Sequence, residues 1–359
     1  MGRGSKKALI SGIIALAASG GLSFLARNAG GFAQWYSVTI YPLLVGTLGR
    51  FSGLLGFSLV EVLLYIVVAA VSGLLIRLVV RIGRKKAGKK DVAGFVSGIF
   101  CFGACLLLVY TLNCGINYHR TSFEESIGLK AQDYTVGQLA QVCIVLTEEL
   151  NNLAPSVARG EDGAMILTGS TEAESVEVMK HIAADFSPLQ GYYPEPKGLI
   201  IPQILSVQSI TGVYSPFTIE ANYNDDITAY NIPFTACHEL SHLRGFMREE
   251  EANFIAWLAC RASDNTEFQY SGSLRGWISC MNALYRANYE VWAAIRVQLN
   301  PLVEYDLAAN RAYWDKYEGK IAQTAEKIND GYLKANGQTD GIKSYGRMAD
   351  LIVAWLAEE

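Results

Sequence analysis

The sequence predicts a membrane-anchored, mainly α-helical protein, in which three N-terminal transmembrane helices precede an α+β domain with a small sheet and many helices. Three observations predict this. Hydrophobic residues make up 51% of the 359 residues, and the mean hydropathy of +0.19 is high for a soluble chain. The long apolar runs lie in the first third of the chain. From Asn113 onward charged residues recur regularly, which indicates a globular domain over residues 113–359.

The membrane region covers residues 1–112 and contains three segments long enough to cross a bilayer. They are residues 8–26, 57–80 and 92–112. Lipid offers no water to the backbone's polar groups, so each segment is expected to be a helix. The lipid bilayer is therefore an expected partner of this chain.

Basic residues predict the orientation in the membrane. Three precede the first span and six lie in the 81–90 loop, whereas the loop between the first two spans holds only Arg27 and Arg50. Because basic loops stay in the cytoplasm, the C-terminal domain is expected to be extracytoplasmic in a multi-pass protein of the cell membrane. The first span also fits a cleaved signal peptide, and cleavage would leave this orientation unchanged.

Charge and cysteine content narrow the function classes. A formal net charge of −4, without a concentrated basic surface in the globular domain, argues against nucleic acid as a partner. The seven cysteines form no C-x-x-C pair and are expected to be free buried thiols. A Cys260–Cys280 disulfide is the alternative if the domain lies outside the cell.

The globular domain begins with helices and then changes character. Helical spacing of leucines predicts a helix near 135–153, and a second is expected at 171–186. The proline-rich stretch 187–202 predicts a loop, and residues 203–224 predict one or two strands. The remaining chain predicts helices at 250–263, 273–298, 301–334 and 342–357.

The strongest chemical signal is H-E-L-S-H at residues 238–242, which uses two of the four histidines. Asn231 is expected to cap its helix, and Pro233 suits the first turn. His238 and His242 are four residues apart on one helix face, so both can bind one Zn²⁺. Glu239 is placed to take a proton from a zinc-activated water and deliver it to the leaving amine.

A third zinc ligand has to come from beyond this helix. A straight helix would put Glu249 roughly 16 Å from His238 along its axis, so the chain must reverse. Gly245 is placed for a left-handed C-terminal cap, after which the acidic cluster 249–251 begins the next helix. One of these carboxylates is expected to return to the metal. The alternative is that they only favour a helix N-terminus.

The stretch E-E-E-A-N at 249–253 resembles the E-x-x-A-[DN] signature of gluzincin metallopeptidases. The resemblance implies a zincin-like domain with Glu249 as third ligand, Glu251 being the second choice. It also implies that Asn253, where Asp is more usual, orients a ligating histidine. The string H-E-L-S-H-L-R-G-F-M-R also resembles the metzincin motif, but Arg248 stands at the third-ligand position and arginine does not bind zinc.

The whole layout is similar to an uncharacterised bacterial family of three-span membrane proteins. The matching stretches are residues 113–118, 216–222, the zinc helix and 344–347. This resemblance implies a zinc-peptidase-like domain without a known substrate.

Two further features have both a functional and a packing interpretation. Residues 213–222 can form an edge strand for an extended substrate or a core strand. Tyr345, in a glycine-flanked turn, can donate to an oxyanion or simply pack.

The leading hypothesis is an extracytoplasmic zinc-dependent peptidase acting on a peptide or protein substrate, with Glu239 as general base. The alternative is a non-catalytic, zinc-stabilised membrane sensor or assembly protein, which the missing Asp at position 253 favours. Intramembrane proteolysis is disfavoured because the motif lies far from every apolar run.

Overall fold

The computed structural model describes residues 2–130, 133–338, 341 and 346–358. The chain forms two compact units. The membrane unit comprises residues 1–120 together with the loop 215–220, and the globular unit comprises residues 121–214 and 221–359.

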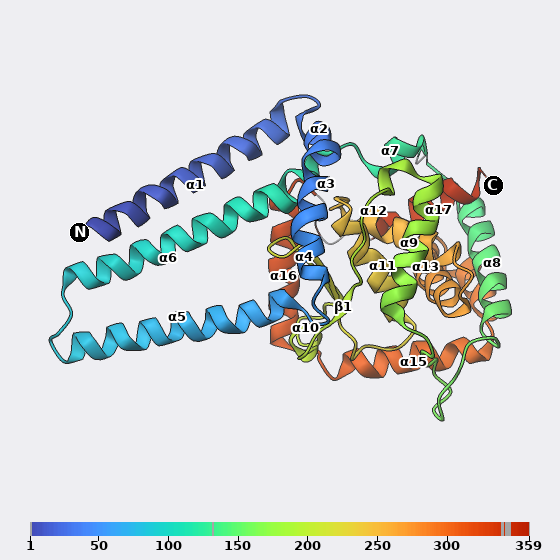
Figure 1. Cartoon of the computed structure of the whole chain (residues 1–359). Helices are drawn as coiled ribbons and strands as arrows, with labels where there is room; N and C mark the ends of the chain where they lie inside the picture. Colours follow the sequence, from blue (N-terminus) through green and yellow to red (C-terminus); the bar gives the residue numbers. More distant parts are fainter. Residues whose placement is uncertain (1, 131–132, 339–340, 342–345, 359) are drawn as a thin grey trace. The chain divides into compact units, whose positions relative to one another are not determined.

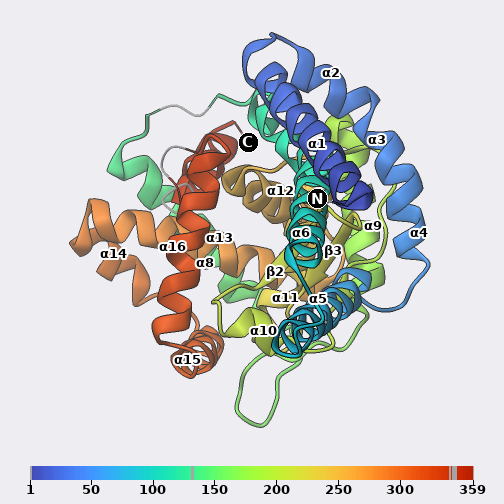
Figure 2. The same cartoon turned by 90° about the vertical axis from the view of Figure 1, so that its left-hand side faces the viewer.

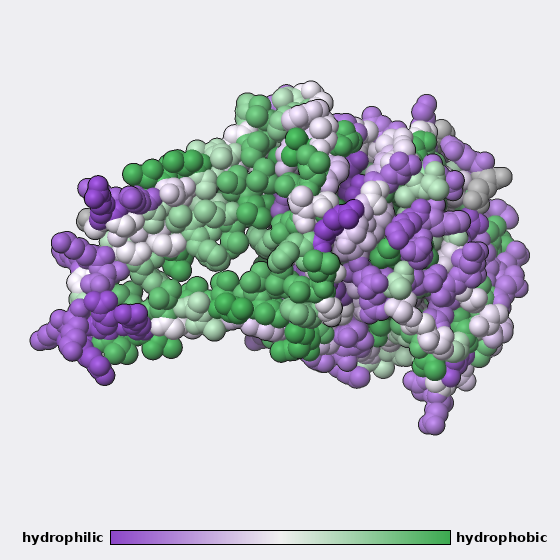
Figure 3. All heavy atoms as spheres, viewed as in Figure 1, coloured by the Kyte–Doolittle hydropathy of each residue, from purple (hydrophilic) through white to green (hydrophobic). Residues whose placement is uncertain are grey.

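The three apolar helices predicted from the sequence are confirmed in the membrane unit. They are α1 (Arg3–Asn28), α5 (Leu59–Gly83) and α6 (Lys89–Tyr110), which continues in helical turns to His119. Their mean hydropathies of 2.0, 2.6 and 2.4 suit a membrane span. Helix α1 packs along α6, whereas α5 runs apart from that pair (Figure 1; Figure 2). Hydrophobic side chains cover these helices, and hydrophilic ones gather at the end that carries the N-terminus (Figure 3).

Short helical segments join α1 to α5. They are α2 (Phe32–Thr39), α3 (Tyr41–Leu44), the π-helical η1 (Val45–Gly49) and α4 (Arg50–Gly53). A second π-helical turn, η2 (Thr111–Gly115), and the 3-10 turn η3 (Asn117–His119) follow α6. Residues 113–118 and 216–222 are two of the stretches that are similar to the three-span family. They contact each other here, because the Asn113 side-chain amide donates a hydrogen bond of 2.6 Å to the carbonyl of Pro216.

The N-terminus of α5 is capped by two side chains. Ser58 accepts from a backbone N–H in the first turn. The Glu220 carboxylate, at the end of the loop 215–220, accepts from the N–H groups of Leu59 at 3.1 Å and Val60 at 2.9 Å. A negative charge at this end of the helix is favourable because the helix dipole is positive there.

Helices dominate the globular unit, as the sequence predicted. They are α7 (Phe123–Ile127), α8 (Val136–Leu153), α9 (Thr171–Asp185), η4 (Ser187–Leu189), α10 (Gln203–Ser206), α11 (Asn231–Leu243), α12 (Glu249–Arg261), α13 (Thr266–Ala287), α14 (Tyr289–Arg296), α15 (Pro301–Asp315), α16 (Lys320–Ala335) and α17 (Met348–Leu356). The predicted helices at 135–153 and 171–186 are confirmed by α8 and α9.

The small sheet has three strands in the order β1-β3-β2. They are β1 (Lys197–Gly198), β2 (Gly212–Ser215) and β3 (Glu220–Tyr223). Strand β1 pairs with β3 in parallel, with Lys197 opposite Asn222. Strand β2 is therefore an edge strand.

Three sequence predictions about element boundaries are wrong. Residues 203–206 form the short helix α10 rather than a strand. The predicted helix 273–298 is two helices, because the Asn288 side chain caps a new N-terminus by accepting from Val291 N–H. The predicted helix 301–334 also consists of two helices, with Gly319 at the start of α16.

All seven cysteines are free, so the alternative Cys260–Cys280 disulfide does not form.

The core of the globular unit forms where α11, α12 and α13 pack against one another, with α8, α9 and α17 around them (Figure 1). Helix α11 is buried on nearly every side. Polar groups on such a helix need partners inside the protein, since water does not reach them. This requirement applies to the charged residues of the motif at 238–242.

Candidate metal centre

Tertiary packing, not a local cap, supports the start of the motif helix. The sequence predicted Asn231 as the cap, which is wrong because Asn231 is the first helical residue and Tyr230 before it offers no side-chain cap. The N–H of Phe234 instead donates a 3.0 Å hydrogen bond to the Ser271 hydroxyl on α13. A distant serine thus satisfies a backbone donor that the helix leaves free.

The two motif histidines lie side by side on α11. Their ring centroids are 4.6 Å apart, with an angle of 84° between the ring planes. Both side chains are largely buried. The four-residue spacing therefore brings the two imidazoles together, as the sequence predicted.

Gly245 reverses the chain after the motif, and its predicted left-handed conformation is confirmed by a φ of 90°. Phe246 N–H donates to the carbonyl of Ser241 at 3.2 Å, which closes the turn expected after a helix. The same turn brings the Phe246 carbonyl to 2.8 Å from Nδ1 of His242. Donation to this carbonyl leaves Nε2 of His242 as the free nitrogen, a partnership that the sequence did not reveal.

The reversal returns Glu249, the first residue of α12, to both histidines. Its Oε2 lies 3.3 Å from Nε2 of His238, and its Oε1 lies 3.8 Å from Nε2 of His242. One donor atom from each of the three side chains lies within 4.8 Å of the others. Ligands of a tetrahedral zinc ion lie about 3.3 Å apart when each bond is about 2 Å, so small side-chain adjustments would suffice to hold one ion.

The other two glutamates of the cluster face elsewhere. The Glu250 carboxylate accepts from the Gln338 amide at 2.7 Å. Glu251 pairs with Arg248, whose Nη1 is 3.2 Å away. Successive helical residues are rotated by about 100°, so the three adjacent carboxylates point in different directions and each contacts a different partner. The structure thus brings Glu249, and not Glu251, to the histidines.

Burial shapes the protonation of the cluster. It lowers the pKa of His242 to about 4, and the nearby charge of His238 adds to this effect. Burial also opposes charge on His238, but the hydrogen bond with Glu249 and the charges of Glu239 and Glu249 outweigh it and raise the pKa of that imidazole. His242 is therefore neutral at physiological pH, the form in which a histidine binds metal.

Glu239 lies beside the histidines and against strand β2. Burial raises the pKa of its carboxyl group to about 8, although a hydrogen bond from the backbone N–H of Tyr214 favours the charged form. Its Oε2 is buried and has no hydrogen-bond partner in the described part of the chain. Such an orphaned acceptor in a protein interior is costly, which suggests that another molecule uses it.

Gly212 in β2 permits this close approach. A Cβ at this position would lie 2.6 Å from Oε1 of Glu239 and 2.7 Å from Cγ2 of Thr235. The sequence pattern did not single out Gly212, although a glycine inside a strand often marks a close approach of backbone to another group.

Replacement of Gly212 by Ala is expected to displace the Glu239 carboxylate. Any hydrolysis in which this carboxylate takes part should then fall roughly 100-fold, since catalysis depends on placement to within about 1 Å. Any metal affinity of His238, His242 and Glu249 should stay unchanged. The checks are activity and metal content of the same preparation. Gly331→Ala, in an open position on α16, is the matched control and should change neither. Full activity of Gly212→Ala would show that this contact does not position Glu239.

No hydrogen bond of the described residues joins the predicted site residue Asn253 to the cluster. Asn253 is buried in α12, but the hydrogen bonds of the described residues include none from Asn253 to His238 or His242, and Nδ1 of His238 is buried without a partner. The predicted role of Asn253 in orienting a histidine stays a prediction. Tyr345 lies outside the described residues.

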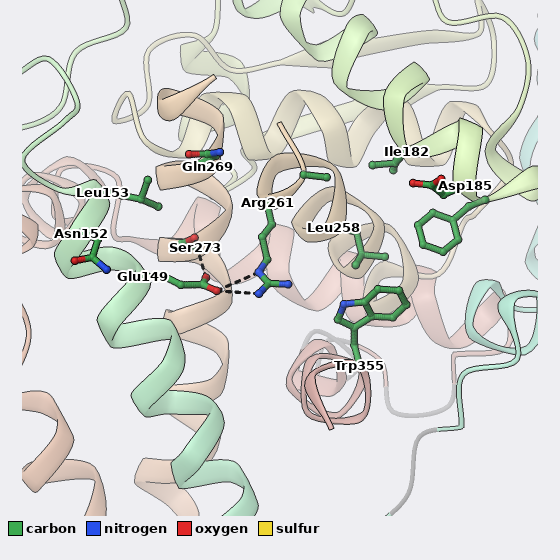
Figure 4. Close-up of a pocket in the computed structure, with 12 residues that line it drawn as sticks. Glu149, Asn152, Leu153, Ile182, Asp185, Leu258, Arg261, Gln269, Ser273 and Trp355 are labelled. Carbon is green, nitrogen blue, oxygen red and sulfur yellow. Dashed lines mark hydrogen bonds and ion pairs between the residues drawn. The ribbon is translucent and has the colours of Figure 1, made fainter. Parts of the chain in front are cut away.

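A separate pocket of about 700 Å³ opens between α8, α9, α12 and α13 in the globular unit (Figure 4). Its polar feature is an ion pair in which Arg261 lies 2.9 Å from Glu149, beside apolar walls that include Leu258 and Trp355. None of the three candidate metal ligands lines it. Arg261 and Glu149 neutralise each other, and Asp185 adds a second carboxylate to the lining.

The fold and the cluster together define a class: a mainly helical protein with three apolar helices and a globular unit that carries a His-His-Glu group able to hold a metal ion. The chain belongs to the DUF3810 family, described as protein of unknown function, whose model matches residues 36–353. No curated protein matches the chain. No solved structure matches it either.

Proposed function

We propose that this protein is a membrane-anchored zinc-dependent metallopeptidase with a zincin-like globular domain. The observation that carries the proposal is the convergence of His238, His242 and Glu249 within 4.8 Å, with the Glu239 carboxylate beside them. Two imidazole nitrogens and a carboxylate oxygen form a donor set that suits catalytic zinc. When bound, zinc would supply Lewis acidity and lower the pKa of a water molecule.

Glu239 is the residue that would move protons in this reaction. Its unpartnered Oε2 would accept a proton from the attacking water and pass it to the leaving amine. The Tyr214 N–H would hold the carboxylate in place during both transfers. Strand β2 is an edge strand beside this carboxylate, and an extended peptide can add to such an edge, which favours a peptide as substrate.

The number of ligands favours catalysis over a purely structural site. Structural zinc is usually closed by four protein ligands, whereas catalytic zinc keeps one position open. The cluster found among the described residues has three members. Of the candidates for a fourth, Glu251 pairs with Arg248, and Cys237 makes a side-chain contact with Cys260. This argues against the alternative of a zinc-stabilised sensor without activity.

The proposed location follows from the basic residues around the apolar helices. The first turns of α1 carry Arg3, Lys6 and Lys7, and the connection between α5 and α6 is also rich in Lys and Arg, whereas the connection between α1 and α5 is not. Positive-inside bias then assigns the globular unit to the extracytoplasmic side.

Purified full-length protein in detergent is expected to contain about one zinc ion per chain and to hydrolyse some members of a mixed peptide library. A chelator should remove both the metal and the activity, and added zinc should restore them. Metal analysis and mass spectrometry of the cleaved peptides are the measurements. Wild-type protein that binds no zinc would contradict the proposal, and zinc without hydrolysis would favour the sensor.

A further inference from the structure

Arg275 on α13 stands apart from the other partly buried arginines of the globular unit. Most of those have a carboxylate partner: Arg159 with Asp306, Arg248 with Glu251, Arg261 with Glu149 and Arg296 with Glu304. In the described part of the chain, Arg275 has no carboxylate within 4.0 Å, although its side chain is partly buried. A cation removed from water without a counter-charge is unfavourable, so its position calls for an explanation.

The contacts of Arg275 are neutral and fix its orientation. Its guanidinium carbon lies 5.1 Å from the centre of the Phe234 ring. Its Nη1 donates to Oδ1 of Asn231 at 3.4 Å. The Asn231 amide nitrogen in turn donates to Thr228 and Asn310, each at 2.8 Å, which leaves its oxygen turned to the guanidinium. These groups hold Arg275 in place without cancelling its charge.

The same contacts place the guanidinium near the candidate metal ligands. The Phe234 ring stacks with His238, with 6.5 Å between centroids and 25° between planes. Together with the distance from Arg275 to Phe234, this limits the separation of the Arg275 guanidinium and the His238 ring to the length of three to four extended residues at ~3.4 Å each.

We infer that Arg275 binds a carboxylate of the substrate, carried by a residue one to three positions from the bond that is cleaved. A guanidinium matches a carboxylate in shape and charge and can bind it through two hydrogen bonds. The carboxylate is either the C-terminal one of a peptide or the side chain of Asp or Glu. This inference rests on the proposed peptidase function and adds a substrate class to it: peptides with an anionic group near the scissile bond.

The pocket of Figure 4 shows why an arginine alone does not imply such a site. Arg261 is held by Glu149 through two contacts, at 2.9 Å and 3.2 Å, so an incoming carboxylate would have to displace the one already there. At Arg275 the structure offers no such competitor among its described residues.

The test uses full-length protein and three matched peptides: one with a free C-terminus, the same peptide amidated, and an amidated form with Glu in place of Gln beside the cleaved bond. Wild type is expected to cleave a peptide that carries the carboxylate with a kcat/KM roughly 10- to 100-fold above that of its neutral counterpart. Arg275→Gln should abolish this preference and Arg275→Lys should keep part of it. Arg311→Gln, an exposed arginine on α15, is the control and should keep it fully.

The outcomes separate the two carboxylate sources and the two proposals. A preference for the free C-terminus assigns Arg275 to the α-carboxylate, and a preference for Glu assigns it to a side chain. Equal cleavage of all three peptides by wild type overturns the inference while leaving the peptidase intact, and it needs no variant that has to fold. A preference that survives in folded Arg275→Gln overturns it as well. Absence of cleavage of any library peptide is the failure of the peptidase proposal itself.

Discussion

Replacement of Glu239 by Gln is expected to abolish hydrolysis while the protein keeps its metal. Glutamine has almost the same shape as glutamate but cannot accept a proton from water, and loss of a general base costs about 10²- to 10⁴-fold in rate. His238, His242 and Glu249 would hold the ion without help from Glu239. Activity and zinc content measured on the same sample are the readouts.

The raised pKa of Glu239 also predicts how the stability of the metal-free protein depends on pH. The folded protein raises this pKa from 4.5 to about 8, so without metal the unfolded chain ionises first as the pH rises. The contribution of Glu239 to the free energy of unfolding therefore falls between about pH 4.5 and 8. Gln lacks this contribution, so after metal removal the variant should melt no lower than wild type at pH 7.

The control for Glu239→Gln is Glu161→Gln, which changes an exposed glutamate of the globular unit. It should leave activity, zinc content and melting temperature unchanged. Glu239→Gln with near wild-type hydrolysis would remove Glu239 from the mechanism. Loss of both zinc and activity would instead assign Glu239 to metal binding.

Replacement of Glu249 by Gln is expected to weaken zinc binding more than any other single change in the acidic cluster. The neutral amide oxygen is a poorer zinc ligand than the carboxylate oxygens that now lie 3.3 Å and 3.8 Å from the two histidines. The affinity should fall by more than the roughly 100-fold that loss of a ligand's hydrogen-bond partner costs. Competition with a chromophoric chelator measures it.

Glu251→Gln provides a matched control two residues away on the same helix. Glu251 pairs with Arg248 and not with a histidine, so the zinc affinity should change only a few-fold. Thermal melts of both metal-loaded variants report any general damage to α12. If Glu251→Gln weakened zinc binding as much as Glu249→Gln, Glu249 could not be assigned as the third ligand in preference to Glu251. If neither change weakened zinc binding, the acidic cluster would supply no zinc ligand.

The sequence alone determined the parts of this protein that depend on short-range patterns. Length and hydropathy identified α1, α5 and α6, because a membrane span is defined within one segment. The four-residue spacing placed His238 beside His242, and Gly245 marked the reversal after them, because both follow from local helix geometry.

Tertiary structure decided the features that join distant segments. Gly212 lies against Glu239 because β2 packs against α11, and Ser271 supports the start of α11 because α13 packs on it. Packing likewise directed Glu249 to the histidines and left Arg275 without a carboxylate partner among the residues that the structure describes. The physical reason is that periodicity fixes which residues share a face of one element, whereas only the packing of elements fixes which faces meet.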